Sequence, residues 1–221
     1  MNKQERERYL RQRLEEMKRF EVETCGSEIA YIAGVDEVGR GPLAGPVTAA
    51  AVVLPRDFDV PGIDDSKKLT AKRREVLYPI IKERALAFGI GMADHQRIDE
   101  INILQATKEA MTAAVREANA MLVAKTKSEI QHVLFDAMII EEVPFPQTSV
   151  IKGDSKSFSI AAASILAKVI RDRLMVQMAE CYPGYGFEKN KGYGTKLHYE
   201  GLEAYGLCAI HRRSFLKNFA K

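Results

Sequence analysis

Carboxylate side chains close three separate apolar runs of this chain. Asp36 and Glu37 stand directly after the first run, Asp136 after the second and Asp154 after the third. In open α/β sheets, ligands bind in the crevice beyond the carboxyl ends of the strands, so these acids could converge at one edge. Converging carboxylates repel one another unless a cation neutralises them, and their oxygens suit hard divalent ions such as Mg²⁺. Because no Cys/His cluster offers a softer set of ligands, the residues predict an oxygen-ligated metal site.

Each acid also has an ordinary structural interpretation. The pair Asp36-Glu37 stands beside glycine and fits a solvated acidic turn. Asp154 stands just before a helical pattern and fits a helix cap. Asp94 ends another apolar run, and we interpret it as a loop acid on a strand of the opposite sense. These alternatives explain single residues, whereas a metal site explains three strand ends together.

The hydrophobic pattern predicts the elements that must position these acids. Strands are expected at 29–35, 46–54, 86–93, 132–135 and 148–151. Helices are expected at 1–20, 71–84, 103–125 and 157–180, followed by a Gly/Tyr-rich loop at 184–194 and short helices at 195–205 and 212–219. Consecutive strands followed by alternating strands and helices predict an α/β fold with a mixed five-stranded sheet, flanking helices and a C-terminal helical segment.

Length and composition indicate one large globular domain, or one domain with an appendage. The chain has 221 residues and is 46% hydrophobic, which is enough for a sizeable core. We expect a charged helical extension at 1–27 and the main domain at 28–221. No apolar run approaches the ~20 residues of a membrane span, and the charged N-terminus does not resemble an export signal, so we expect a cytoplasmic protein. The three cysteines are odd in number and lack paired spacing, which excludes a disulfide framework and a structural zinc site.

The uneven distribution of charge along the chain favours a phosphate-bearing partner, whereas the net charge by itself does not. The formal net charge is only +3. Lysine and arginine nevertheless outnumber acidic residues between 189 and 221, where they alternate with Tyr193, Tyr199 and Phe215. Basic and aromatic groups together suit phosphates and sugar faces. A solvated basic surface remains the alternative for each residue taken singly.

Six motifs along the chain resemble those of a known family and occur in its order. They are GVDEVGRGP at 34–42, DSKKL at 65–69, KGDS at 152–155, AAASILAK at 161–168, KGYGT at 191–195 and HRRSF at 211–215. Together they cover roughly residues 28 to 218, and the chain resembles the bacterial ribonuclease HII family, the type 2 ribonucleases H. The resemblance implies a ribonuclease H-like fold and hydrolysis of the RNA strand of RNA/DNA hybrids, including incision on the 5′ side of single ribonucleotides embedded in duplex DNA.

The resemblance also implies roles for individual residues. Asp36, Glu37, Asp136 and Asp154 match the family's four metal-binding carboxylates, and these are the acids that the strand ends select. Two Mg²⁺ or Mn²⁺ ions are implied, with products that carry a 3′-hydroxyl and a 5′-phosphate. Because no base needs to be read, low sequence specificity is expected.

The substrate-binding residues are assigned in the same way. Gly39, Arg40 and Gly41 match the motif that senses the ribose 2′-hydroxyl, and Tyr193 matches the tyrosine that packs against the neighbouring sugar. Phosphate contacts are implied for Ser66, Lys67, Lys68, Ser164 and Lys168. From the residues alone, a loop tyrosine in a surface groove is the preferred interpretation of Tyr193, and a small residue that allows helix packing is a nearly equal interpretation of Ser164. His198 and His211 pair with no nucleophile, so we interpret them as structural or phosphate-neighbouring.

One position departs from the family pattern, and two other functions compete with the nuclease. Ala137 stands where the family commonly has glycine, which removes no ligand. The alternatives are a non-catalytic nucleic-acid-binding module with a structural ion, and a small-molecule Mg²⁺ phosphotransferase with Asp36 as nucleophile. We expect a monomer that acts on RNA/DNA hybrids and on DNA duplexes containing ribonucleotides, with no membrane partner.

Overall fold

A five-stranded sheet in the order β3-β2-β1-β4-β5 forms the centre of the computed structural model, which describes residues 2–217 and 219. Its strands are β1 (Ile32–Val38), β2 (Val47–Val53), β3 (Ala87–Ala93), β4 (His132–Asp136) and β5 (Gln147–Val150). The helices are α1 (Lys3–Cys25), α2 (Ala71–Arg84), α3 (His95–Thr126), α4 (Phe158–Cys181), α5 (Phe187–Asn190) and α6 (Lys196–Tyr205), with 3-10 turns η1 (Gly153–Ser155) and η2 (Arg213–Phe215). Among these described elements, no helix is long and apolar enough to cross a membrane.

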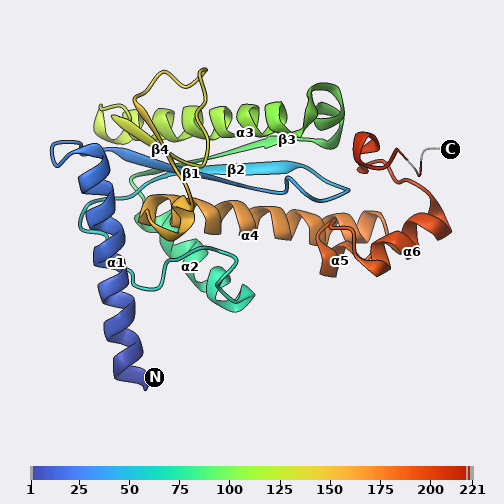
Figure 1. Ribbon diagram of the computed structural model, residues 1–221, viewed down its shortest axis with the longest axis horizontal. Helices are drawn as coiled ribbons and strands as arrows, with labels where there is room; N and C mark the ends of the chain where they lie inside the picture. Colours follow the sequence, from blue (N-terminus) through green and yellow to red (C-terminus); the bar gives the residue numbers. More distant parts are fainter. Residues whose placement is uncertain (1, 218, 220–221) are drawn as a thin grey trace.

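Helices cover both faces of the sheet. Figure 1 shows α3 along one face and α4 along the other, with α2 beyond α4 and α1 at the end of the sheet. The buried strand β2 contributes to both cores: Ala49 and Ala51 join the cluster that includes α3, whereas Ala50 and Val52 join the cluster that includes α4. This alternation follows from the two-residue period of a strand. The sheet is therefore held between two hydrophobic cores.

The directions of the strands place the carboxyl ends of four strands at the same end of the sheet. β1 pairs antiparallel with β2, and β2 pairs antiparallel with β3, so β3 runs parallel to β1. β4 and β5 also run parallel to β1. The expectation that the strand before Asp94 runs in the opposite sense is therefore wrong. Asp94 nevertheless stays apart from Asp36, because β2 lies between their strands, and it caps α3 by accepting from the Arg97 N–H (2.8 Å).

The structure confirms the mixed five-stranded sheet and differs from the sequence prediction at several boundaries. The first strand was expected to end before the acids, but β1 contains Asp36 and Glu37 because β2 supplies pairing partners as far as Val38. The predicted helix at 103–125 is the second part of α3, whose path bends at Asn102, where φ is 69°. The helix expected at 212–219 is only the turn η2, and residue 218 lies outside the described part of the chain.

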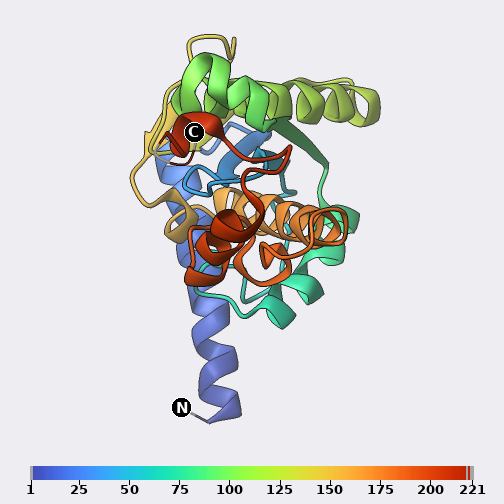
Figure 2. The same ribbon diagram turned by 90° about the vertical axis from the view of Figure 1, so that its right-hand side faces the viewer.

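The N-terminal helix α1 packs on the body through its second half. Leu14 and Met17 are buried in the α4-side core, whereas the first half of the helix extends away from the body in Figures 1 and 2. The Arg13 guanidinium donates to the Ser155 carbonyl in η1. This charged extension, expected at 1–27, thus touches the turn that carries Asp154.

Glu21 of α1 is a buried acid that caps the start of α4. Its carboxylate accepts from the Ser157 hydroxyl, the Ser159 N–H (2.8 Å) and the Ser159 hydroxyl (3.2 Å). Burial raises the pKa of Glu21 to about 7, although these hydrogen bonds oppose the shift. Because the raised pKa lies above that of the unfolded chain, Glu21 contributes stability at acidic pH that is lost as the pH rises through about 7.

Glu21→Gln should therefore change how stability depends on pH. The difference in unfolding free energy between variant and wild type should move in the variant's favour by about 3 kcal/mol between pH 5 and pH 8, because the variant avoids ionising a buried carboxyl. Urea unfolding at several pH values measures this difference. Glu23→Gln, on the exposed side of the same helix, is the control. Parallel profiles for Glu21→Gln and wild type would contradict the prediction.

Candidate active site

Three of the predicted metal ligands lie where two parallel strands end side by side. Val35 of β1 is aligned with Phe135 of β4, so Asp36 and Asp136 follow on neighbouring strands. Glu37 is the next residue of β1. The register therefore brings together acids that are a hundred residues apart in the sequence.

The turn η1 places the fourth acid, Asp154, near the ends of these two strands. The Gly153 N–H donates to the Asp136 carboxylate (2.7 Å), which ties η1 to the end of β4. A Cβ at Gly34 would overlap the backbone of Ser159 and Ile160, so β1 and the start of α4 approach as closely as a glycine permits. Asp154 does not cap α4, because Ser157 does so through the Ile160 N–H (3.1 Å).

Burial and neighbouring charge perturb the ionisation of Asp36, Glu37 and Asp154. Burial raises the pKa of Asp36 well above its ordinary value, and the charges of Glu37, Asp136 and Asp154 raise it further. Burial also raises the pKa of Asp154, with added repulsion from Asp65 and Asp136. For Glu37, burial raises the pKa while the Arg40 guanidinium, with Nη1 3.5 Å from Oε1, opposes the shift. A compact group of acids that resist ionisation is a site that a cation would stabilise.

The donor chemistry fits a hard divalent ion, although the side chains do not converge as they stand. Within residues 2–217 and 219, no group of three or more His, Cys, Asp or Glu side chains is arranged to hold a metal ion. Protein donors engage two of the acids instead, since Gly153 binds Asp136 and Arg40 pairs with Glu37. The Lys67 ammonium lies 3.9 Å from Asp154 and is itself 79% exposed, so it can move away at little cost.

The loop after β1 lies against the loop that carries Tyr193. The Leu43 N–H donates to the Gly192 carbonyl (2.8 Å), and a Cβ at Gly41 would lie 3.6 Å from the Tyr193 ring. Tyr193 keeps 41% of its surface exposed. Arg40 and Gly41 thus share one surface with an accessible aromatic ring, whereas Gly39 is buried.

The residues predicted to contact phosphate lie in three places. Lys67 and Lys68 lie beside the acids, and the Lys68 ammonium donates to the Ser155 hydroxyl (2.8 Å). Ser66 and Ser164 are buried and bonded to each other, because the Ser66 N–H donates to the Ser164 hydroxyl (3.3 Å). That contact makes Ser164 a support for the 65–69 loop.

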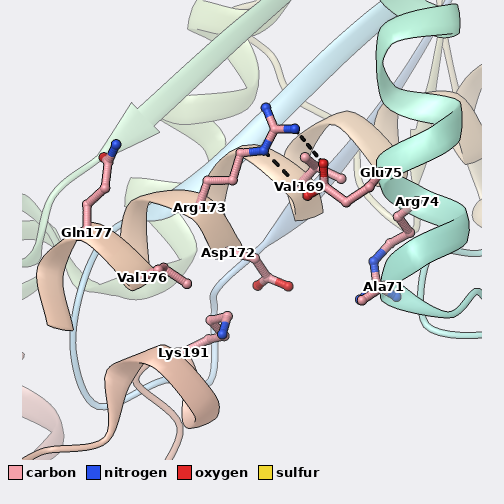
Figure 3. Close-up of a pocket in the computed structure, with 9 residues that line it drawn as sticks. All are labelled: Ala71, Arg74, Glu75, Val169, Asp172, Arg173, Val176, Gln177 and Lys191. Carbon is pink, nitrogen blue, oxygen red and sulfur yellow. Dashed lines mark hydrogen bonds and ion pairs between the residues drawn. The ribbon is translucent and has the colours of Figure 1, made fainter.

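Lys168 lies in a different place, next to a cavity away from the acids. Its ammonium pairs with Asp172 at 2.8 Å. Asp172 lines a cavity of about 430 Å³ between α2, α4 and Lys191, and Figure 3 shows the Arg173–Glu75 ion pair at its wall. None of the predicted site residues lines this cavity. The chemistry is therefore expected at the carboxyl ends of β1 and β4, where the acids lie.

Comparisons with known proteins agree with this geometry. The ribonuclease HII family matches residues 33–218. The chain belongs to the ribonuclease HII family. It is 51% identical to the ribonuclease HII of Caldanaerobacter subterraneus subsp. tengcongensis over 95% of this chain and 83% of that one. Family membership makes the chain an endoribonuclease of the ribonuclease H type, a divalent-metal-dependent class that acts on RNA/DNA hybrids, and favours this interpretation over both alternatives.

Solved structures share the ribonuclease H-like fold. The ribonuclease H2 from Pyrococcus horikoshii OT3 aligns with a TM-score of 0.67 at 26% identity, over 86% of this chain and 99% of that chain. The Mn²⁺ complex of Bst-RNase HIII aligns with a TM-score of 0.64 at 22% identity, over 84% and 67% of the two chains, a likeness of fold alone. Ala137, the departure from the family pattern, has a φ of 51°, a conformation that favours glycine and explains why glycine is common there.

Sequence analysis missed the contacts that support the two loops of this ribonuclease HII. Arg171 and Arg212 are buried beneath the Gly39–Pro46 segment. The sequence offered only weak signals for them, namely the apolar helical run around Arg171 and the motif that contains Arg212. The interpretation of His198 and His211 as structural fits their burial. They form a chain of hydrogen bonds that ends at the Tyr193 backbone.

The hydrogen-bonding pattern assigns the tautomers of this histidine pair. Nδ1 of His211 accepts from the Cys208 N–H (2.8 Å), so its Nε2 carries the proton and donates to Nε2 of His198 (2.9 Å). Nδ1 of His198 then donates to the Tyr193 carbonyl (3.0 Å). Burial, with a smaller contribution from His198, lowers the pKa of His211 to about 4. Both rings must be neutral for the chain to persist.

Acid should weaken this histidine pair. Because the pKa of His211 falls below its unfolded value of about 6.5, its contribution to stability is present above that pH and is lost as the pH falls toward 4. Protonation of His211 should cost the wild type about 3 kcal/mol of unfolding free energy between pH 7 and pH 4, and His211→Asn should not show this loss in urea unfolding. Lys189→Gln, an exposed position in α5, is the control. If His211→Asn lost as much unfolding free energy as the wild type between pH 7 and pH 4, the assignment of neutral, hydrogen-bonded histidine rings would be wrong.

Proposed function

We propose that this ribonuclease HII cleaves the RNA strand of RNA/DNA hybrids and also incises duplex DNA on the 5′ side of a single embedded ribonucleotide. The observation that carries the proposal is the meeting of Asp36, Asp136 and the Asp154 turn at the end of β1 and β4. Beside them lies a glycine-lined loop with an exposed tyrosine, a surface suited to a sugar.

Asp36, Glu37, Asp136 and Asp154 would hold the metal ions. Mg²⁺ or Mn²⁺ fits, because both accept carboxylate oxygens. When bound, two such ions would supply the activation of water and the stabilisation of the leaving 3′ oxygen, for a hydrolysis that gives a 3′-hydroxyl and a 5′-phosphate. The repulsion among the acids makes this site selective for cations.

Lys67 and Lys68 would place the scissile phosphate. Both extend from a single loop toward the acids, and Lys67 can exchange its contact with Asp154 for a phosphate oxygen. Ser66 and Ser164 would hold that loop from below through their own hydrogen bond. Lys168 would contact the phosphate backbone farther from the reacting bond.

Substrate choice would rest on the sugar and not on the bases. Gly39, Arg40 and Gly41 present backbone groups, and Tyr193 presents a ring face beside Gly41. A 2′-hydroxyl both donates and accepts, so backbone groups at this loop can distinguish RNA from DNA. We further propose a monomer acting in the cytoplasm, where such hybrids form, with 28–221 as the catalytic domain and 1–27 as its extension.

The proposal is tested with matched duplexes that contain zero, one or four consecutive ribonucleotides. Wild type should cut the second and third only, and only with Mg²⁺ or Mn²⁺. Asp36→Asn should reduce that cleavage by more than about 100-fold, since even residues outside the first coordination shell change metal affinity or activity 10–100-fold. It should also weaken Mn²⁺ binding measured by calorimetry.

The control for Asp36→Asn is Asp57→Asn, in the exposed segment after β2. Because β2 runs antiparallel to β1, this segment lies at the opposite end of the sheet from Asp36. Circular dichroism verifies that each variant is folded. Full activity in Asp36→Asn would refute the carboxylate assignment, and cutting of the all-DNA duplex would refute the proposed substrate.

Removing the ring of Tyr193 tests how the sugar is contacted. Tyr193→Ala should lower kcat/KM at a single ribonucleotide about tenfold, a loss typical of one aromatic stacking contact. Tyr193→Phe keeps the ring and should retain most of the rate. Tyr9→Ala, on the extended half of α1, removes another exposed tyrosine as a control. An unchanged rate in Tyr193→Ala would mean that the ring does not contact the sugar.

A further inference from the structure

Two fully buried arginines lie beneath the surface proposed to read the sugar. Arg171 of α4 and Arg212, just before η2, are each 0% exposed. Among the described residues, neither forms an ion pair with an acidic side chain, whereas Arg173 pairs with Glu75. Buried arginines almost always have a counter-charge or a functional reason to lack one. Their partners indicate that reason.

Arg171 binds backbone carbonyls of both loops at once. Its guanidinium donates to the carbonyls of Pro46 (2.8 Å), Lys191 (2.9 Å) and Ala44 (3.2 Å). Ala44 and Pro46 belong to the loop after β1, and Lys191 begins the segment that carries Tyr193. One side chain therefore joins the two loops.

Arg212 binds the same loop closer to the glycines. It donates to the carbonyls of Gly39 (2.6 Å), Arg40 (3.0 Å) and Gly45 (2.9 Å). It reaches them because the C-terminal segment returns from α6 to the start of α3, as Figure 2 shows, where Asp99 accepts from the Arg213 N–H (2.8 Å). Two residues of the proposed 2′-hydroxyl sensor are thus held by one guanidinium.

The loop conformation depends on the space that these arginines fill. Gly39 has a φ of 99°, and a Cβ there would overlap the Arg171 side chain. The loop carbonyls point inward to the guanidinium groups, so this part of the backbone is fixed from below. Its outer side is free to meet a ligand.

The two charges also repel each other. Burial lowers the pKa of Arg212 to about 9, with a further contribution from Arg171, whose own pKa burial lowers to about 10. Both remain charged at neutral pH. Six carbonyl oxygens accept from the two guanidinium groups, and the nearby charges of Asp172 and Asp99 favour the charged forms of Arg171 and Arg212 respectively, which offsets part of the cost of burial.

We propose that Arg171 and Arg212 are positioning residues that fix the Gly39–Pro46 loop against Tyr193 and thereby set discrimination between ribose and deoxyribose. The inference rests on the proposed function of that loop. Lysine cannot replace them, because a single ammonium lacks the planar set of donors that binds three carbonyls together. Arg212→Lys and Arg171→Lys therefore keep the charge and lose the geometry.

The test measures discrimination in binding, separately from turnover. Two duplexes differing in one 2′-hydroxyl are titrated in Ca²⁺, and the ratio of their Kd values is taken for each variant. Arg212→Lys and Arg171→Lys should each lower this ratio about tenfold, as expected when hydrogen bonds to a charged group are lost. A ratio does not depend on the folded fraction, so partial unfolding alone leaves it unchanged.

Matched controls come from the neighbouring exposed arginines. Arg213→Lys and Arg173→Lys should leave the ratio at the wild-type value. If wild type itself fails to cut at a single ribonucleotide, the proposed function is wrong. If wild type cuts there and both buried variants keep its ratio, the positioning role is wrong.

Discussion

The parallel pairing of β1 with β4 is the constraint on which the site depends. Its register sets Asp36 beside Asp136, and the hydrogen bond from Gly153 to Asp136 brings the Asp154 turn to the same place. Concentrating carboxylates in a partly buried edge opposes their ionisation, as the raised pKa values of Asp36 and Asp154 indicate. The hydrophobic packing on both faces of the sheet supplies the stability that keeps these groups together.

Helix α4 connects the acids with the loop that would read the sugar. Its start lies against Gly34 of β1, and Arg171 further along the helix lies against Gly39. Eleven helical residues and five strand residues each span about 17 Å, so α4 and β1 advance together between these contacts. One pair of packed elements therefore holds Gly34 and Gly39 at a set separation.

Buried polar groups support this pair at both ends. Glu21 caps the start of α4, Ser164 holds the 65–69 loop from its middle, and Arg171 holds the loops beyond it. The His198–His211 pair then supports the Tyr193 backbone. The contributions of Glu21 and His211 depend on pH in opposite directions, because that of Glu21 is lost as the pH rises toward 7 and that of His211 is lost as the pH falls toward 4.

The sequence alone determined the chemistry and the class of fold. Acids after apolar runs identified Asp36, Asp136 and Asp154, and hydrophobic periodicity predicted the mixed sheet, because side-chain type and period are local properties. Tertiary structure decided where β1 ends, since the pairing of Val38 with Thr48 is not local. It also decided the roles of Glu21, Arg171 and Arg212. Most of their partners are backbone groups distant in the chain, and a backbone carbonyl or amide is the same in every residue, so no sequence pattern could have named them.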